Sequence, residues 1–116
     1  MKTIALFGGS GGVGSQLVSY LEEKYNVISI GSKDVDVTNL TEVKEFFENN
    51  DIDIVLNFSG KKYDVFLHKI TEEDTAEVQS MLDVNVTGNI NIVAGCLPHM
   101  REKGWGRVIL ISSVFS

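Results

Sequence analysis

The chain has 116 residues, of which 43% are hydrophobic and 22% charged, a composition typical of one globular domain spanning 1–116. Its net charge of −6 argues against a general nucleic-acid binder, because such proteins present a basic face. The single cysteine, Cys96, excludes an internal disulfide and favours a reducing compartment, so we expect a cytoplasmic location. No apolar run approaches the ~20 residues of a membrane span, so we expect no membrane partner.

The hydrophobic pattern predicts strands that alternate with helices. Strands are expected at residues 3–7, 26–30, 52–58 and 107–112, and helices at 15–24, 39–48 and 72–102. Residues 34–37 allow a further short strand. Continuously apolar strands that alternate with helices predict an α/β fold with a parallel sheet covered on both faces, of the doubly wound Rossmann type.

Two of the predicted helices open on capping patterns, and the last one contains weak points. The capping patterns are Asn39 with Glu42 and Thr71 with Asp74, which resemble capping boxes. Residues 85–91 include several poor helix formers, so we expect a kink or a break inside the region 72–102. Pro98 permits another interruption.

Glycines crowd the turn between the first strand and the first helix, where five of the seven residues from Gly8 to Gly14 are glycine. A strand, a glycine turn and a helix in this order bind phosphate, because bare backbone N–H groups and a helix N-terminus with about +0.5 charge approach the anion. Three dinucleotide registers fit: Gly9-x-Gly11-x-x-Gly14, Gly8-x-x-x-Gly12-x-Gly14 and Gly8-x-x-Gly11-x-x-Gly14. A P-loop would need lysine where Ser15 stands, which argues against an ATPase.

Further stretches along the chain sharpen this interpretation. They are Asp36-Val37-Thr38, residues 57–60 (Asn-Phe-Ser-Gly), residues 84–88 (Val-Asn-Val-Thr-Gly), residues 97–100 (Leu-Pro-His-Met) and residues 106–113 (Gly-Arg-Val-Ile-Leu-Ile-Ser-Ser). In this order and spacing, the chain resembles the N-terminal half of the short-chain dehydrogenase/reductase family over essentially its whole length. The resemblance implies a Rossmann fold that lacks its C-terminal strands and helices, with a nicotinamide dinucleotide as cofactor.

The resemblance selects one glycine register and implies a set of cofactor-binding residues. In the family's phosphate-binding pattern, Gly8, Gly12 and Gly14 match, while Phe7 replaces a threonine that usually ties the turn to a neighbouring strand. The implied cofactor-binding residues are Gly8, Ser10, Gly11, Gly12, Val13, Gly14, Ser32, Lys33, Asp36, Val37, Asn57, Ser59 and Gly60. Of these, Asp36 and Val37 would lie next to the adenine ring, and residues 57–60 would pass under the adenosine ribose.

Two residues match the family's catalytic machinery, which transfers a hydride between the nicotinamide ring and a small-molecule carbonyl or alcohol carbon. Asn85 matches an asparagine that takes part in a proton relay through water, and Ser113 matches the serine that orients the carbonyl. The chemistry also needs a tyrosine and a lysine in a Tyr-x-x-x-Lys pattern after the serine. No such pair follows Ser113, and Tyr20-x-x-x-Lys24 lies on the first helix. We therefore expect a truncated or partly ordered enzyme that is inactive as these 116 residues.

The choice between NAD and NADP depends on the end of the second strand. An enzyme that prefers NAD usually places a carboxylate there to accept hydrogen bonds from the ribose hydroxyls. Ser32 and Lys33 stand there instead and suit a 2′-phosphate better, so we favour NADP. Asp34 keeps NAD open if the loop shifts by two residues. The helix and strand that usually follow are missing, so the adenine end would be less enclosed.

Other functions stay open at this point. One is a non-catalytic dinucleotide-binding module that acts as a sensor or regulatory subunit. Another is an epimerase or dehydratase of the related extended family, which the third glycine register and the short second loop allow, although Asn85 and residues 97–100 argue against it. The resemblance implies a homodimer or homotetramer formed through the long helix, and we expect no metal site.

Overall fold

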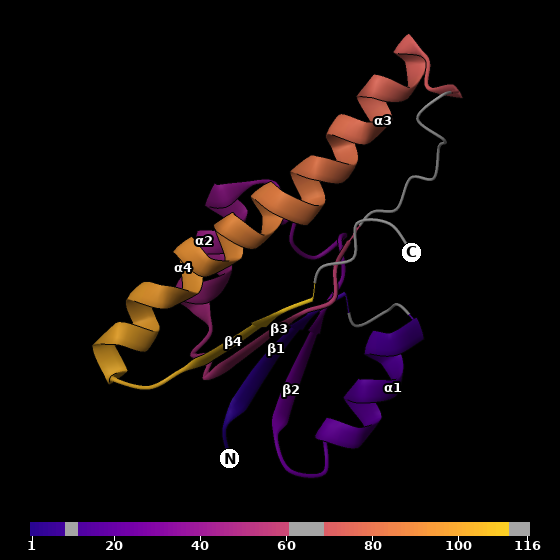
Figure 1. The fold of residues 1–116 in the computed structure, drawn as a ribbon. Helices are drawn as coiled ribbons and strands as arrows, with labels where there is room; N and C mark the ends of the chain where they lie inside the picture. Colours follow the sequence, from indigo (N-terminus) through magenta and orange to yellow (C-terminus); the bar gives the residue numbers. More distant parts are fainter. Residues whose placement is uncertain (9–11, 61–68, 112–116) are drawn as a thin grey trace.

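A computed structural model describes residues 1–8, 12–60 and 69–111 (Figure 1). Its four strands are β1 (Thr3–Phe7), β2 (Asn26–Ile30), β3 (Ile54–Asn57) and β4 (Arg107–Leu110). Its helices are α1 (Gly12–Leu21), α2 (Leu40–Asn49), α3 (Glu72–Leu82) and α4 (Gly88–Lys103), with a π-helical turn, Asp83–Thr87, between α3 and α4. Strands and helices therefore alternate as the hydrophobic pattern predicts.

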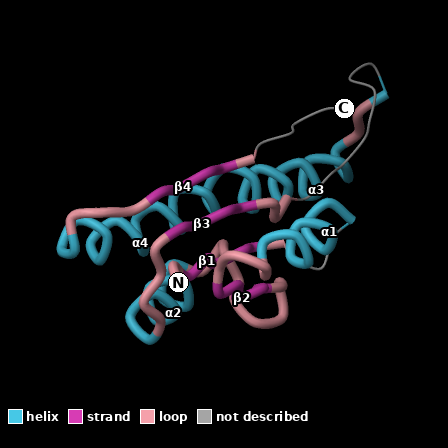
Figure 2. The backbone as a smooth tube through the Cα atoms, turned by 90° about the horizontal axis from the view of Figure 1, so that it is seen from below, coloured by secondary structure: helices cyan, strands magenta, loops and turns pink. Residues whose placement is uncertain are grey.

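The strands form one parallel sheet in the spatial order β2-β1-β3-β4. Helix α1 lies on one face, and α2 and α4 lie on the other, as Figures 1 and 2 show from two directions. Phe7 pairs with Ile30 and Asn57, and Asn57 pairs with Leu110, so all four strands end at nearly the same level. The predicted Rossmann-type sheet is confirmed, with β2 and β4 as its two edges.

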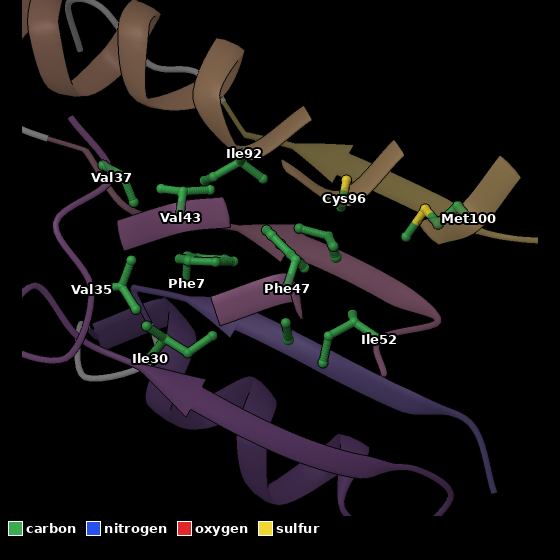
Figure 3. Close-up of a cluster of buried hydrophobic side chains, with 12 residues drawn as sticks. Phe7, Ile30, Val35, Val37, Val43, Phe47, Ile52, Ile92, Cys96 and Met100 are labelled. Atoms are coloured by element: carbon green, nitrogen blue, oxygen red, sulfur yellow. The ribbon is translucent and has the colours of Figure 1, made fainter. Parts of the chain in front are cut away.

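The hydrophobic core fills the space between the sheet and the pair α2 and α4 (Figure 3). Three aromatic rings meet in it, with centroids 5.7 Å apart for Phe7 and Phe46 and 5.1 Å apart for Phe46 and Phe47. A Cβ on Gly95 of α4 would lie 2.9 Å from the Phe47 ring and 3.0 Å from a Val43 methyl. The absence of a side chain at this position therefore lets α4 press directly on α2.

The short strand allowed at residues 34–37 does not form, because this segment folds into turns. A carboxylate oxygen of Asp34 accepts from the backbone N–H of Gly31 at 2.9 Å. Asp36 likewise accepts from the N–H of Thr38 at 3.0 Å. Aspartates that bond nearby backbone groups stabilise turns and compete with a strand ladder. Residues 31–39 thus connect β2 directly to α2, and the outer edge of β2 has no neighbour among the described residues.

The capping patterns are confirmed in part. Asn39 accepts from the N–H of Glu42 at 3.2 Å, but the Glu42 carboxylate accepts from the N–H of Asp36 instead of closing a box. Thr71 and Asp74 form the complete reciprocal capping box that opens α3. Each cap satisfies backbone N–H groups that the first turn of a helix leaves without partners.

The predicted interruption of the long helical region is the π-helical turn Asp83–Thr87, where the N–H of Gly88 bonds to the carbonyl of Asp83. Pro98 causes no second break, since α4 continues through it to Lys103. Figure 2 shows α3 and α4 running along β3 and β4 as one long helical arm. The π turn thus interrupts this arm between α3 and α4, and π turns inside helices often occur at functional sites.

Candidate functional site

A cleft of about 430 Å³ opens at the carboxyl ends of β1, β2 and β3. It is lined by Phe7, Gly8, Ile30, Gly31, Ser32, Val35, Asp36, Val37, Phe58, Ser59, Gly60 and Val84. The chain leaves β1 over one face of the sheet to reach β2, and crosses the other face to reach β3. Such a reversal of strand order is the place where open α/β sheets bind ligands.

Six of the lining residues belong to the predicted cofactor-binding set: Gly8, Ser32, Asp36, Val37, Ser59 and Gly60. The other six were missed, and they are Phe7, Ile30, Gly31, Val35, Phe58 and Val84. Phe7, Phe58 and Val84 belong to the motif stretches, whereas Ile30, Gly31 and Val35 have no motif of their own. The one signal for these last three was their place at or after the end of the second predicted strand.

Gly8 occupies a position that only glycine fits. Its φ is +81°, in the left-handed region, and a Cβ there would lie 2.6 Å from both the carbonyl carbon of Phe58 and the nitrogen of Ser59. Its N–H donates to the carbonyl of Ile30 at 2.9 Å, and the N–H of Phe58 donates to the carbonyl of Phe7 at 2.8 Å. Backbone hydrogen bonds therefore tie the end of β1 to both neighbouring strands, while the Phe7 side chain is buried in the core.

Helix α1 begins at Gly12, directly after the glycine turn, which is three residues earlier than the sequence predicts. Gly12, Val13 and Gly14 form its first turn, and that turn carries no acidic residue. The positive end of the helix dipole therefore has no carboxylate of its own to compete with an anion. Ser10 and Gly11 lie outside the described residues, as does Ser113.

The loop after β2 forms one rim of the cleft. Ser32 and Asp36 line the cleft and are exposed, whereas Lys33 is exposed without lining it. The Asp34 carboxylate lies outside the lining and bonds to the N–H of Gly31. Asp36 also accepts from the Thr38 hydroxyl at 2.6 Å. The loop therefore uses both of its carboxylates to fix its own shape.

A row of asparagine amides supports the opposite side of the cleft. Asn57 is fully buried, and its Oδ1 accepts from the backbone N–H of Ser59 at 2.9 Å and from the Ser59 hydroxyl. Its Nδ2 donates to Oδ1 of Asn89 at 2.5 Å, and Nδ2 of Asn89 donates to the carbonyl of Asn85 at 2.8 Å. The network thus joins the end of β3 to the π turn. Asn89 was not predicted as a site residue, and its one signal was its low helix propensity.

Asn85 lies beside this network at the edge of the cleft. A Cβ on Gly60 would be 3.2 Å from Oδ1 of Asn85, so glycine at position 60 leaves room for this amide. Val84, the residue before it, lines the cleft. The structure therefore brings the predicted catalytic Asn85 next to the predicted cofactor-binding segment 57–60.

Asp53, Cys96 and Lys103 have shifted pKa values, and none of these three residues lines the cleft. Burial raises the pKa of the Cys96 thiol to about 11, so this residue belongs to the core and not to a reactive site.

Among residues 1–8, 12–60 and 69–111, no cluster of His, Cys, Asp or Glu side chains could hold a metal ion. Within the same ranges, no helix combines the length and the apolarity that crossing a membrane requires.

Sequence comparison decides the family. The profile that describes short chain dehydrogenases matches residues 18–116. The chain belongs to the short chain dehydrogenase family. The match begins inside α1, so the segment before it is supported by the geometry of Gly8 and by the longer alignments below.

Curated relatives of this short chain dehydrogenase include an uncharacterized oxidoreductase of Staphylococcus saprophyticus, 29% identical over 138 residues. That alignment covers 97% of this chain and 55% of the relative. An acetoacetyl-CoA reductase of Cupriavidus necator is 32% identical over 81 residues, which are 70% of this chain and 32% of the reductase. The aligned part of the chain thus corresponds to about half of the first relative and about a third of the reductase. Because an alignment of 138 residues exceeds the 116 of this chain, the relative contains residues with no counterpart here.

Solved structures agree with the family assignment. A short chain dehydrogenase of Leptospira borgpetersenii with bound NAD+ superposes with a TM-score of 0.77 at 28% identity, covering 94% of this chain and 50% of that protein. One of Burkholderia cenocepacia in complex with NADP gives a TM-score of 0.80 at 21% identity, covering 95% and 53%. This second likeness shows the fold alone. The short chain dehydrogenase fold of the present chain is therefore supported by both sequence and structure.

Proposed function

We propose that this chain binds a nicotinamide dinucleotide in the cleft and is the cofactor-binding half of an oxidoreductase. The oxidoreductase would transfer a hydride between the nicotinamide ring and a carbonyl or alcohol carbon of a small molecule. The observation that carries the proposal is the cleft at the strand-order reversal, which starts at Gly8, a position where a side chain has no room. Membership of the short chain dehydrogenase family supports the same cofactor class.

Each part of the cleft suits a different part of the dinucleotide. The glycine turn and the amino end of α1 would supply N–H groups for the diphosphate. Ser32, Asp36 and Val37 would contact the adenosine half, and Val35 adds an apolar wall on which a base can pack. Residues 57–60 would pass under the adenosine ribose, and Asn85 lies next to them, since a Cβ on Gly60 would be 3.2 Å from its Oδ1.

Between the two cofactors, we favour NADP. Asp34, the one carboxylate that would suit NAD by a shift of the loop, already bonds to the N–H of Gly31 and lies outside the cleft lining. Ser32 lines the cleft, and the exposed Lys33 beside it would supply a positive charge for a 2′-phosphate. Neither bears the carboxylate that the ribose hydroxyls of NAD would need.

Isothermal titration of the purified chain with NADPH and NADH tests this preference. We expect NADPH to bind more tightly and Lys33→Gln to weaken NADPH by about fivefold while leaving NADH unchanged, as loss of one exposed charge contact predicts. Lys44→Gln is the matched control, since Lys44 is an exposed residue of α2 outside the cleft lining. Tighter binding of NADH than of NADPH would contradict the preference.

For catalysis, we propose that Ser113 orients the substrate carbonyl and that Asn85 takes part in a proton relay. The 116 residues contain no Tyr-x-x-x-Lys pattern after Ser113, so we expect cofactor binding without turnover. The test is NADPH oxidation by the pure 116-residue chain with a panel of small ketones and aldehydes, read at the absorbance of the reduced ring. Measurable oxidation above the buffer rate would overturn the expectation.

We further propose that the protein forms a homodimer or homotetramer through the long helical arm. Leu82, Val86 and Ile90 are spaced four residues apart along this arm and are 41%, 51% and 62% exposed. Apolar side chains at this spacing lie on one face, where a second copy could cover them. Sedimentation analysis of the chain and of Val86→Glu tests this, with a shift to monomer expected for the variant.

A further inference from the structure

The loop that connects β2 to α2 is held from a distant part of the chain. Nδ2 of Asn91 donates to the backbone carbonyl of Val37 at 2.9 Å, across 54 positions of sequence. Both residues are 8% exposed. A Cβ on Gly88 would lie 2.8 Å from a methyl group of Val37. Gly88 and Asn91 are three residues apart on α4 and therefore face the same way, so α4 presents one small and one hydrogen-bonding residue to the loop.

The other hydrogen bonds of this loop are local and fix its shape without fixing its position. Asp34, Asp36 and Glu42 all bond to backbone N–H groups within six residues of their own. Val35 and Val37 make the long-range contacts, since both side chains join the core cluster that includes Val43 and Ile92 (Figure 3). Val37 also accepts the hydrogen bond from Asn91, so its contact with α4 sets where this part of the loop stands relative to the rest of the cleft.

The contact between Val37 and α4 supports a loop that follows an edge strand, since β2 lies at one edge of the sheet. Residues 31–39 run from that strand directly into α2, with no further helix or strand behind them among the described residues. Asp36 and Val37 nevertheless line the cleft. A loop without a neighbouring strand needs another support if it is to present these two residues in one fixed arrangement, and α4 provides that support.

We propose that Asn91 is a positioning residue that acts through Val37 to set the adenosine-side wall of the cleft, with Gly88 providing the necessary close approach. The proposal rests on the proposed function, because it assumes that the adenosine half of a dinucleotide binds at this wall. Loss of the Asn91 amide leaves a buried carbonyl without its partner, and the loop moves to reach water. Binding of the adenosine half must then order the displaced loop again, and the cost of this ordering lowers the affinity for the dinucleotide.

The test uses adenosine 2′,5′-bisphosphate and NADPH as probes of the 116-residue chain. Asn91→Leu, which has a similar size but no donor, should weaken both ligands by about tenfold at a temperature where circular dichroism shows the variant folded. Asn50→Leu is the matched control, because Asn50 also donates its Nδ2 to a backbone carbonyl, that of Phe46 at 2.8 Å, but lies outside the cleft lining. This control should lose stability without losing affinity.

Asn91→Asp gives a pH signature that a merely structural role would not produce. The introduced carboxyl would face the Val37 carbonyl in a buried setting, which raises its pKa and allows the protonated form to donate again. The ratio of its dissociation constant to that of the unmodified chain should therefore fall towards 1 between pH 8 and pH 5. If Asn91→Leu does not fold, this variant and Gly88→Ala, which should also weaken both ligands, decide the question.

The outcomes separate the two proposals. If the unmodified chain binds neither NADPH nor the bisphosphate, the proposed function fails. If it binds both but the folded Asn91 and Gly88 variants bind equally well at every pH, the positioning role is wrong while the proposed function stands. Weaker binding confined to these variants, with the pH-dependent recovery of Asn91→Asp, supports the role of Asn91.

Discussion

The two ends of the sheet are built from different chemistry. At the amino end, the Nζ of Lys103 lies 2.7 Å from a carboxylate oxygen of both Asp51 and Asp53, and Asp53 also accepts from the N–H of Thr3 at 2.8 Å. At the carboxyl end, neutral amides and backbone groups connect the elements instead. Asn57 is fully buried there and bonds to Asn89 and to the backbone N–H of Ser59. Charged pairs thus join the elements at one end and uncharged groups at the other.

The charged pairs at the amino end contribute to stability alone, whereas the amides at the carboxyl end also support the cleft. The charged pairs are partly exposed, with 27% of the Lys103 side chain accessible, and such pairs contribute about 1 kcal/mol or less. They line no part of the cleft. Asn57 is fully buried and its bond to Asn89 is partly buried, so breaking this bond costs more, and the amides themselves add no charge to the cleft. We expect substitutions at the amino end to change stability alone and substitutions at the carboxyl end to change both.

The largest effect should come from Gly8→Ala, compared with Gly104→Ala. Both glycines have positive φ, +81° and +73°, but Gly8 has backbone atoms at 2.6 Å from a Cβ and Gly104 has nothing within 4 Å. Gly104→Ala should cost about 1–2 kcal/mol from the left-handed backbone alone and leave NADPH affinity unchanged. Gly8→Ala should cost about 3 kcal/mol or more and weaken NADPH at least about 100-fold.

Urea unfolding and isothermal titration measure the two quantities on the same preparations. The backbone strain is nearly equal in the two variants. The additional loss of unfolding free energy in Gly8→Ala therefore measures the collision of the new Cβ with Phe58 and Ser59. Equal losses of stability in both variants, or undiminished binding by Gly8→Ala, would show that the turn can move away and that the close approach has no role.

A smaller effect is expected where the amide network is broken. Asn57→Leu removes the acceptor of Ser59 and the donor to Asn89 and should lower the free energy of unfolding by about 2–3 kcal/mol. Asn89→Leu should cost about 1–2 kcal/mol, because Asn57 then keeps its bonds to Ser59. NADPH should bind more weakly to Asn57→Leu, since Ser59 and Gly60 line the cleft.

A double-mutant cycle of Asn57→Leu and Asn89→Leu, followed by urea unfolding, measures the coupling within the network. Residues that share a hydrogen bond should show a coupling energy of about 0.5 kcal/mol or more. Strict additivity of the two losses would mean that the network does not act as a unit.

The comparison of the two ends also explains how far the sequence could be interpreted. The alternation of apolar strands and helices was enough for the Rossmann-type sheet, and the glycines were enough to place the turn after β1. Gly8 was identifiable through the family's glycine pattern, and the structure shows that it stands in a left-handed, crowded position that admits no other residue. The cofactor roles of Gly8, Ser32, Asp36 and the other implied residues stay predictions.

What the sequence could not provide depends on segments that meet only in the folded chain. Asn89 and Asn91 carry no motif, and their partners, Asn57 and Val37, are 32 and 54 residues away. The extra strand at residues 34–37 was wrong for a related reason. Hydrophobic alternation does not show that an aspartate will bond to its own neighbours and turn the chain before a ladder can form.

The smallest effect is expected at the amino end, from Lys103→Met, and its pH dependence identifies the cause. The hydrogen bond from Lys103 is the main reason that the pKa of Asp53 is lowered, with a second bond from the Thr3 N–H. Burial opposes the charge of Lys103, but its bonds to Asp51 and Asp53 outweigh burial and raise the pKa of Lys103. We expect the variant to lose about 1 kcal/mol at pH 7 and to keep its NADPH affinity.

The signs of the two shifts define the pH window. A lowered carboxyl pKa gives a contribution that is complete above its unfolded value near 4 and is lost as the pH falls through the folded value. A raised lysine pKa gives one that is complete below about 10 and is lost as the pH rises through the folded value. The difference in urea stability between the chain and Lys103→Met should therefore be greatest between about pH 5 and pH 9 and shrink on either side. A difference that persists unchanged at pH 3 would assign it to packing of the lysine stem and not to its charge, and the contrast between a charged and a neutral end would then lose its energetic meaning.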